Sequence, residues 1–230
     1  MLFPSLAPIT SSAAFFQARP QVVHRAIVSW YEELYSSVVA AVVSGEARPI
    51  REELERLLTP LVRGGFSKLV VVECDGEWSC VFNNAYLGTD TSSLDEIARR
   101  IGVKYVSVML SEDVRTRAGV LWHGARQFCL VDYSASSRPV VRTISVMNDG
   151  SRWRFYQEGD PLPQEDPAWV LGPRIADRFS ENALVLLADS VGVRLLSESF
   201  YKRVFSQVRI HVQSEEIDLH SARRQFGFEH

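Results

Sequence analysis

The sequence has no excess of basic residues, no long apolar run and few cysteines. Its 25 Lys and Arg residues are outnumbered by 28 Asp and Glu residues, and the net charge is -3. A dedicated nucleic-acid-binding protein carries a basic patch, so we expect no nucleic-acid partner. The longest wholly apolar run is Val38–Val43, whereas a membrane-spanning helix needs about 20 apolar residues. We therefore expect no membrane partner either.

The three cysteines, Cys74, Cys80 and Cys129, all lie in segments that the pattern predicts to be strands. An odd number of cysteines in apolar surroundings is typical of reduced core thiols rather than of a disulfide framework. The first eighteen residues also lack the basic start of an export signal. These features predict a cytoplasmic protein. A disulfide between Cys74 and Cys80 remains an alternative, because the two flank a predicted hairpin turn.

Several motifs that would identify an enzyme are missing. There is no GxxxxGK[ST] or GxGxxG phosphate loop, no GxSxG nucleophile elbow, and no HExxH or CxxC metal motif. The sequence therefore predicts no cofactor and no metal site. It does not exclude an enzyme whose site is assembled from scattered residues.

The most informative stretch is 124–163, which contains three β-rich runs, 128–133, 140–147 and 152–157. The last two runs are joined by Asn148-Asp149-Gly150. Asp-Gly between alternating runs predicts a tight hairpin turn, because glycine accepts the positive φ that such a turn needs. This stretch therefore predicts an antiparallel meander.

Alternation along the last run separates two kinds of side chain. Successive residues of a strand point to opposite faces, so Trp153 and Phe155 are predicted to face the core. Arg152, Arg154 and Tyr156 are predicted to face solvent. Arg and Tyr are enriched at protein interfaces. We predict a binding surface at Arg152, Arg154, Tyr156 and Glu158. The alternative is that the arginines only keep the sheet surface soluble.

The remaining elements follow from helical spacing, capping residues and apolar runs. The predicted helices are 20–44, 49–58, 91–101, 174–179 and 181–191. The predicted strands outside the meander are 66–74, 78–83, 104–110 and an edge strand from Val204. The segments predicted to lack regular structure are an apolar lead at 1–18, a surface loop at 112–118 and a mobile tail at 215–230.

Strands joined mainly by hairpins build an antiparallel sheet. We therefore predict an α+β fold with a mainly antiparallel sheet of five to seven strands, an N-terminal helix pair and short C-terminal helices. The predicted parts are an N-terminal helical element at 1–65, a core at 66–205 and an edge segment with a tail at 206–230. The helix pair packs on the sheet or, alternatively, is an appended interaction element.

Three dispersed sets of residues could carry chemistry. A thiol with an imidazole base and an orienting carboxylate suits acyl transfer, and the candidates are His123, Cys129 or Cys80, and Asp132. Paired carboxylates suit acid–base work, and the candidates are Asp149, Glu158 and Asp160. A metal set would consist of His211, Asp218 and His220. An alternative explanation needs no site: the cysteines are buried core residues, and the acidic residues belong to ordinary turns.

Three segments resemble uncharacterised bacterial α+β proteins: NDGSRWRFYQEGDPLPQED at 148–166, RIADRF at 174–179 and WSCVFNNAYLGTD at 78–90. The resemblance covers about residues 66–200. It transfers no functional residue, but proteins of this kind are associated with the immunity or adaptor proteins of toxin systems.

The leading hypothesis is a non-enzymatic module that binds another protein, such as a toxin or effector. The rival hypothesis is a small enzyme, a hydrolase or transferase, with a site around His123 and Cys129. A third reading is a structural or phage-type assembly component.

Overall fold

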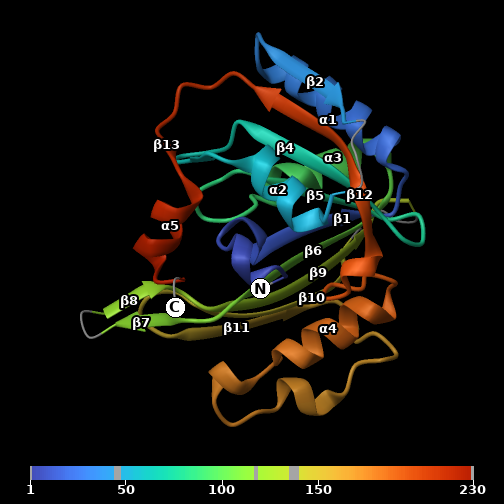
Figure 1. The fold of residues 1–230 in the computed structure, drawn as a ribbon. Coiled ribbons are helices and arrows are strands. Elements are labelled where there is room, and N and C mark those ends of the chain that lie inside the picture. Colours follow the sequence, from blue (N-terminus) through green and yellow to red (C-terminus); the bar gives the residue numbers. More distant parts are fainter. Residues whose placement is uncertain (1, 44–47, 117–118, 135–139, 229–230) are drawn as a thin grey trace.

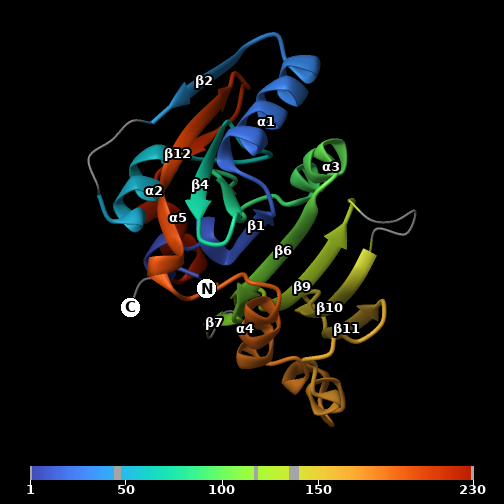
Figure 2. The ribbon, with the colours of Figure 1, turned by 90° about the vertical axis from the view of Figure 1, so that its right-hand side faces the viewer.

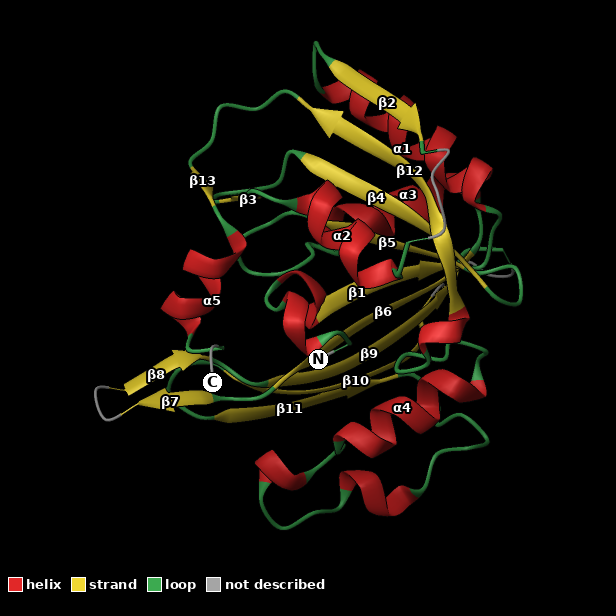
Figure 3. Ribbon diagram, in the orientation of Figure 1, coloured by secondary structure: helices red, strands yellow, loops and turns green. Residues whose placement is uncertain are grey.

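The computed structural model describes residues 2–43, 48–116, 119–134 and 140–228. Its central element is one nine-stranded sheet in which every neighbouring pair is antiparallel (Figures 1 and 3). In spatial order the strands are β11 (Trp153–Glu158), β10 (Val140–Asn148), β9 (Ala125–Asp132), β6 (Lys104–Ser111), β1 (Ser12–Phe16), β5 (Ser79–Asn83), β4 (Lys68–Cys74), β12 (Tyr201–Ile210) and β2 (Val38–Val42). The predicted α+β class with a large antiparallel sheet is confirmed, although nine strands replace the predicted five to seven.

The helices and two small ribbons surround this sheet. The helices are α1 (Pro20–Leu34), α2 (Ile50–Leu58), α3 (Ser92–Ile101), α4 (Glu181–Ser190) and α5 (Leu219–Phe226). The ribbons pair β3 (Leu61–Val62) with β13 (Glu216–Ile217), and β7 (Val114–Thr116) with β8 (Gly119–Trp122). Within the described residues, no helix is both long enough and apolar enough to cross a membrane.

The sheet has two apolar layers, one on each face. One layer contains Phe15 and Phe128 together with the buried sides of α2, α4 and α5, and we call this side the α4 face. The other layer contains Phe16 and Tyr105 together with the buried sides of α1 and α3, and we call it the α3 face. Figure 2 shows α1 and α3 beside one another over β4, β1 and β6, while β9, β10 and β11 extend beyond them.

Most of the locally encoded elements form where the sequence places them. Helix α3 ends at Gly102 with a left-handed φ of 64°, and Ser180 caps α4 by accepting a hydrogen bond from the Ala183 amide at 3.2 Å. The run Leu69–Val72 in β4 is buried on both faces, as its continuous apolar character predicts. Of the predicted helix 174–179, only a 3-10 turn at Ile175–Asp177 forms.

The predicted helix 20–44 is wrong in its second half. Helix α1 ends at Leu34, and Val38–Val42 forms β2 at the edge of the sheet, paired with β12. Valine is stiff at χ1 and favours strands over helices. The prediction of an edge strand from Val204 is wrong in its position. Strand β12 pairs with both β4 and β2 and therefore lies inside the sheet.

The predicted irregular lead at 1–18 contains β1, which lies between β6 and β5. All five residues of β1 are buried, so its sequence lacks the alternation of polar and apolar residues that would predict a strand. Residues before 66 therefore contribute to the same sheet as residues 66–205.

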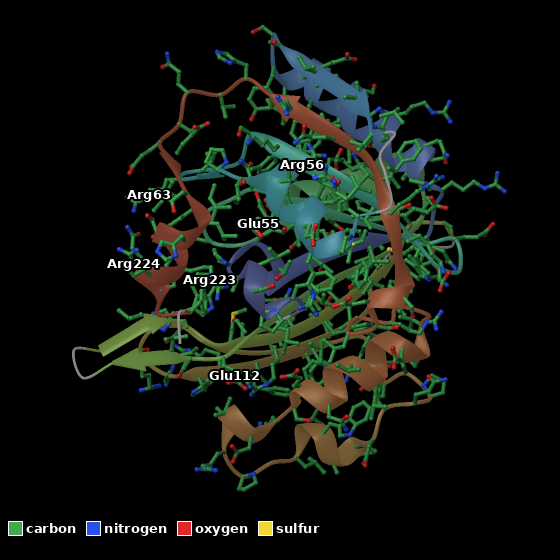
Figure 4. All side chains as sticks on the ribbon, viewed as in Figure 1. Glu55, Arg56, Arg63, Glu112, Arg223 and Arg224 are labelled. Atoms are coloured by element: carbon green, nitrogen blue, oxygen red, sulfur yellow. The ribbon has the colours of Figure 1, made fainter. Side chains whose placement is uncertain are left out.

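The predicted mobile tail at 215–230 is wrong for the residues that the structure describes. Asp218 caps α5, and Gly227 ends it with a φ of 71°. The guanidinium of Arg223 donates to the carbonyl oxygens of Pro4 and Ser5 at 2.8 Å, which fastens α5 to the start of the chain. Figure 4 shows Arg223 on α5. Residues 229 and 230 lie outside the described residues.

The predicted surface loop at 112–118 also differs. The segment contributes β7, which pairs with β8 to form a short ribbon, and residues 117 and 118 lie outside the described residues. Cys74, Cys80 and Cys129 are all free thiols, so the alternative disulfide between Cys74 and Cys80 is not formed. Cys129 is half-buried, whereas the other two are buried.

Candidate functional site

Four paired strands align their side chains in rows across the α3 face. One row consists of Ser107 on β6, Cys129 on β9, Thr143 on β10 and Glu158 on β11. The next row consists of Met109, Gln127, Ser145 and Tyr156. Neighbouring strands lie about 4.8 Å apart, so each row spans about 14 Å from β6 to β11. The rows therefore connect residues of β6 and β9 with the predicted binding residues Tyr156 and Glu158 on β11.

The β6 and β9 ends of these rows form the floor of a cavity of about 700 Å³. Ser107, Cys129 and Gln127 line the floor, and loop 85–92, the start of α3 and Tyr133 line the walls. A volume of 300 to 1,000 Å³ is typical of cavities that bind a small molecule or a protruding group. The cavity therefore has a size that suits a bound group.

Loop 85–92 is held firmly against β1. Ser12 donates a hydrogen bond to the Thr89 carbonyl at 2.6 Å, and the Thr89 hydroxyl donates to the Ile9 carbonyl at 3.1 Å. Gly88 has a φ of 97°, and a side chain at this position would meet the Pro8 carbonyl oxygen at 2.9 Å. Such close approach of two backbones requires glycine. The cavity wall is thus formed in advance and does not depend on a ligand.

The polar groups of the cavity are mainly hydroxyls and carboxylates. Tyr133 donates its hydroxyl to Oδ2 of Asp95 at 2.8 Å, and Tyr105 donates to the Thr91 carbonyl at 2.9 Å. Burial, followed by the hydrogen bond to Asp95, raises the pKa of Tyr133. Asp90 accepts from the Ser92 amide at 3.0 Å. Among the described residues, neither Asp90 nor Asp95 forms an ion pair, and no Lys, Arg or His lines the cavity.

Cys129 is the only nucleophile-type sulfur in this lining, and its surroundings keep it protonated. Burial is the main cause that raises its pKa, and the Asp95 and Glu158 carboxylates raise it further. Thr143 donates a hydrogen bond to its sulfur at 3.3 Å. Because the thiolate is the reactive form, these surroundings do not suit nucleophilic catalysis near neutral pH.

We expect Cys129 to react slowly with iodoacetamide at pH 8 in the native protein. The rate should be well below that of the same cysteine in urea, because burial both raises the pKa of the thiol and restricts access to it. The rate should rise as the pH rises through the elevated pKa. Mass spectrometry of labelled peptides measures both effects, with buried Cys80 as the more protected control. Fast labelling at pH 7 would contradict the protonated state.

The predicted Cys/His/Asp set does not come together. His123 is exposed and lies before β9, close to the turn at Gly150. Cys129 on β9 is six residues further along the chain, which is about 20 Å in extended backbone. Asp132 accepts hydrogen bonds from Ser134 at the far end of β9. Cys80 is buried in the apolar layer of the α4 face, on the other side of the sheet from Cys129.

Asp149 of the acidic set and Asp218 of the metal set are both engaged in local contacts. Asp149 accepts hydrogen bonds from Ser151 and pairs with Arg154, and these contacts lower its pKa. Asp218 is occupied as the cap of α5. In the part of the chain that the structure describes, no three His, Cys, Asp or Glu residues are grouped as a metal site.

The predicted binding residues lie largely as strand alternation predicts. Trp153 and Phe155 pack against the apolar layer of the α4 face. Arg154 and Tyr156 are exposed on the α3 face, and the Tyr156 side chain, with 54% of the residue accessible, donates its hydroxyl to Glu158. Arg152 is exposed in the turn before β11.

Sequence reasoning missed the cavity and its residues Asp95, Tyr133 and Gln127. A signal was available in β6, where Ser107 stands among alternating apolar residues. Such a pattern marks a face that is less apolar than its opposite. Comparisons of the chain with models of protein families, with curated proteins and with solved structures gave no match.

Proposed function

We propose that the chain is a non-enzymatic protein-binding module that docks a partner protein on the α3 face of β9, β10 and β11. One observation supports this proposal. The side-chain rows run without a break from the cavity floor on β6 and β9 to the exposed residues Tyr156 and Glu158 on β11. One partner could therefore contact the exposed residues of β11 and reach into the cavity at the same time.

The residue types on this face favour protein binding over catalysis. Tyr156 and Arg154 are exposed beside each other on β11, and Tyr and Arg are frequent among residues that dominate binding energy. The groups that could act as nucleophile and base are Cys129 on β9 and His123 before β9, and they lie far apart. The resemblance of residues 78–90, 148–166 and 174–179 to bacterial α+β proteins suggests a partner of the toxin or effector kind, with the chain as its immunity or adaptor protein.

We expect a photo-crosslinking residue at position 156 to capture one dominant protein in the source cells. Substitution Tyr156→Ala should weaken binding of that purified protein by about 10- to 100-fold, because a central aromatic truncation costs about 1.4 to 3 kcal/mol. Surface plasmon resonance measures the affinity.

The matched control is Leu171, a side chain that is 74% exposed in the loop after β11. A crosslinker at 171 should not capture the same protein, and Leu171→Ala should bind normally. Equal capture from both positions, or an affinity of Tyr156→Ala within twofold of the parent, would contradict docking on the α3 face.

A further inference from the structure

We propose that the cavity between α3 and the sheet receives an arginine side chain of the docked partner. This inference rests on the proposed function, since the cavity floor and the proposed docking face are the two ends of the same side-chain rows. It adds to that function a chemical identity for the group that the partner inserts.

Charge is the first reason for a cationic guest. The described residues that line the cavity include the carboxylates of Asp90 and Asp95 and no basic side chain. The nearby Arg63 lies against the Tyr86 ring and is paired with Glu215. A third carboxylate, Glu158, lies close enough to Cys129 on the floor to raise its pKa. A recess lined by charges of one sign focuses the field and favours a guest of the other sign. The chain therefore presents a negative recess to its partner.

Unused acceptor oxygens are the second reason. Tyr133 donates to Oδ2 of Asp95, and Ser92 donates to Oδ1 of Asp90. Within the described residues, the second oxygen of each carboxylate accepts no hydrogen bond. The first-turn amides of α3 would favour an anion, but Asp90 already accepts from one of them. Each of these two lining carboxylates therefore keeps an oxygen that can accept a hydrogen bond from a guest.

Arginine fits this lining better than lysine does. Tyr133 lines the cavity and donates to Asp95, and a guanidinium stacks on an aromatic face while it donates to carboxylates in its own plane. Arginine is also enriched at protein interfaces. The cavity volume of about 700 Å³ exceeds a single side chain, so it accommodates the arginine together with the turn of partner chain that carries it.

The wall behind Tyr86 is fixed by contacts that do not involve the guest. Arg63 lies over the Tyr86 ring at 4.8 Å and pairs with Glu215 at 3.2 Å. Phe226 of α5 also packs against Tyr86, with ring centroids 4.7 Å apart. Figure 4 shows Arg63 near α5. A guest therefore meets a recess whose shape is set before it binds, which limits the entropy cost of binding.

The test is an NMR titration of the full chain with the peptide acetyl-Ala-Arg-Ala-amide. A second peptide with citrulline in place of arginine keeps the shape and removes the charge. We expect the arginine peptide to bind with a dissociation constant of about a millimolar, as suits so small a ligand. It should shift the amide signals of Gln127, Cys129 and Tyr133. The citrulline peptide should bind at least about fivefold more weakly.

The variant that tests the carboxylates is Asp90→Asn/Asp95→Asn. We expect it to lose at least about fivefold in affinity for the arginine peptide. The matched control is Glu52→Gln/Glu55→Gln, which removes two exposed carboxylates from α2 on the α4 face and should bind as the parent does. Dispersion of the amide spectrum shows that each variant is folded.

Three results would overturn the inference. These are equal binding of the citrulline peptide, unchanged binding by Asp90→Asn/Asp95→Asn, and shifts that map outside the cavity. Agmatine binding tighter than about 10 μM would also overturn it, because such affinity marks a site for a free small cation.

The captured partner separates this inference from the proposed function. If Tyr156→Ala weakens the complex and Asp90→Asn/Asp95→Asn does not, the docking face stands and the arginine site is refuted. If neither substitution weakens the complex, the docking proposal itself fails, and the peptide titration decides the cavity separately.

Discussion

Substitution Phe15→Ala is expected to lower the free energy of unfolding by about 3 to 5 kcal/mol, the usual cost of removing a buried aromatic side chain. Phe15 is fully buried in β1, the central strand of the sheet. Its ring packs against Phe200 and Tyr201, with centroids 6.3 Å and 6.5 Å away. The change would leave a cavity in the apolar layer of the α4 face, and urea unfolding followed by tryptophan fluorescence measures the loss.

The matched control is Val39→Ala in the edge strand β2. Val39 is 59% exposed, and substitutions at exposed positions usually change stability by no more than about 0.5 kcal/mol. A cost below about 1 kcal/mol for Phe15→Ala would mean that residues 12–16 do not lie at the centre of the sheet.

These two positions also show where sequence reasoning fails on strands. The run Ser12–Phe16 is apolar on both faces because both neighbours in the sheet and both layers cover it. A short continuous apolar run cannot be distinguished from a helix or an apolar loop by periodicity. The run Val38–Val42 has helical spacing with the residues before it, but its partner β12 lies more than 150 residues later. Non-local pairing of this kind leaves no local signal.

Helix α5 is a different case, because its signals were present. Leu219, Ala222 and Phe226 recur at helical spacing, Asp218 provides the cap and Gly227 the stop. The meander and the turn at Gly150 were predicted from local chemistry and are confirmed. The features that can be predicted are those set by neighbours in sequence.

The candidate site could be predicted only in part. Alternation predicts that Arg154 and Tyr156 share a face, because that needs only one strand. The row from Ser107 through Cys129 to Glu158 needs the register of four strands, and a shift of one residue would turn every side chain to the other face. The register depends on packing between distant segments. The cavity therefore emerges only in the folded chain.

The second large effect is expected at Arg142 on β10. Its guanidinium is 2% exposed and forms two hydrogen bonds of 2.7 Å to Glu165, whose side chain is 5% exposed. It also donates to the carbonyl oxygens of Glu158 and Gly159 and to the Gln157 side chain. Substitution Arg142→Met would leave the Glu165 carboxylate buried without its cation. We expect a loss of about 3 to 5 kcal/mol in the free energy of unfolding, measured by urea unfolding.

Two further variants separate charge burial from loss of packing. Arg142→Met/Glu165→Leu should be more stable than Arg142→Met alone, because it leaves no unpaired buried charge. Arg154→Met breaks a pair with Asp149 in which the Arg154 side chain is 50% exposed, and such surface pairs contribute about 1 kcal/mol or less. If Arg142→Met cost no more than Arg154→Met, the buried pair would not stabilise this region.

The same arginine connects stability to binding. Arg142 holds the backbone of Glu158 and Gly159 at the end of β11, and Glu158 closes the row that begins at the cavity floor. Releasing this end should let β11 open locally before the rest of the sheet unfolds, since edge elements open at lower free energy than the core. Hydrogen exchange in Arg142→Met should therefore quicken at residues 155–159 more than at β6. Partner binding should weaken although neither Tyr156 nor Asp95 is changed. Unchanged exchange at β11 would show that the edge is held by its pairing with β10 alone.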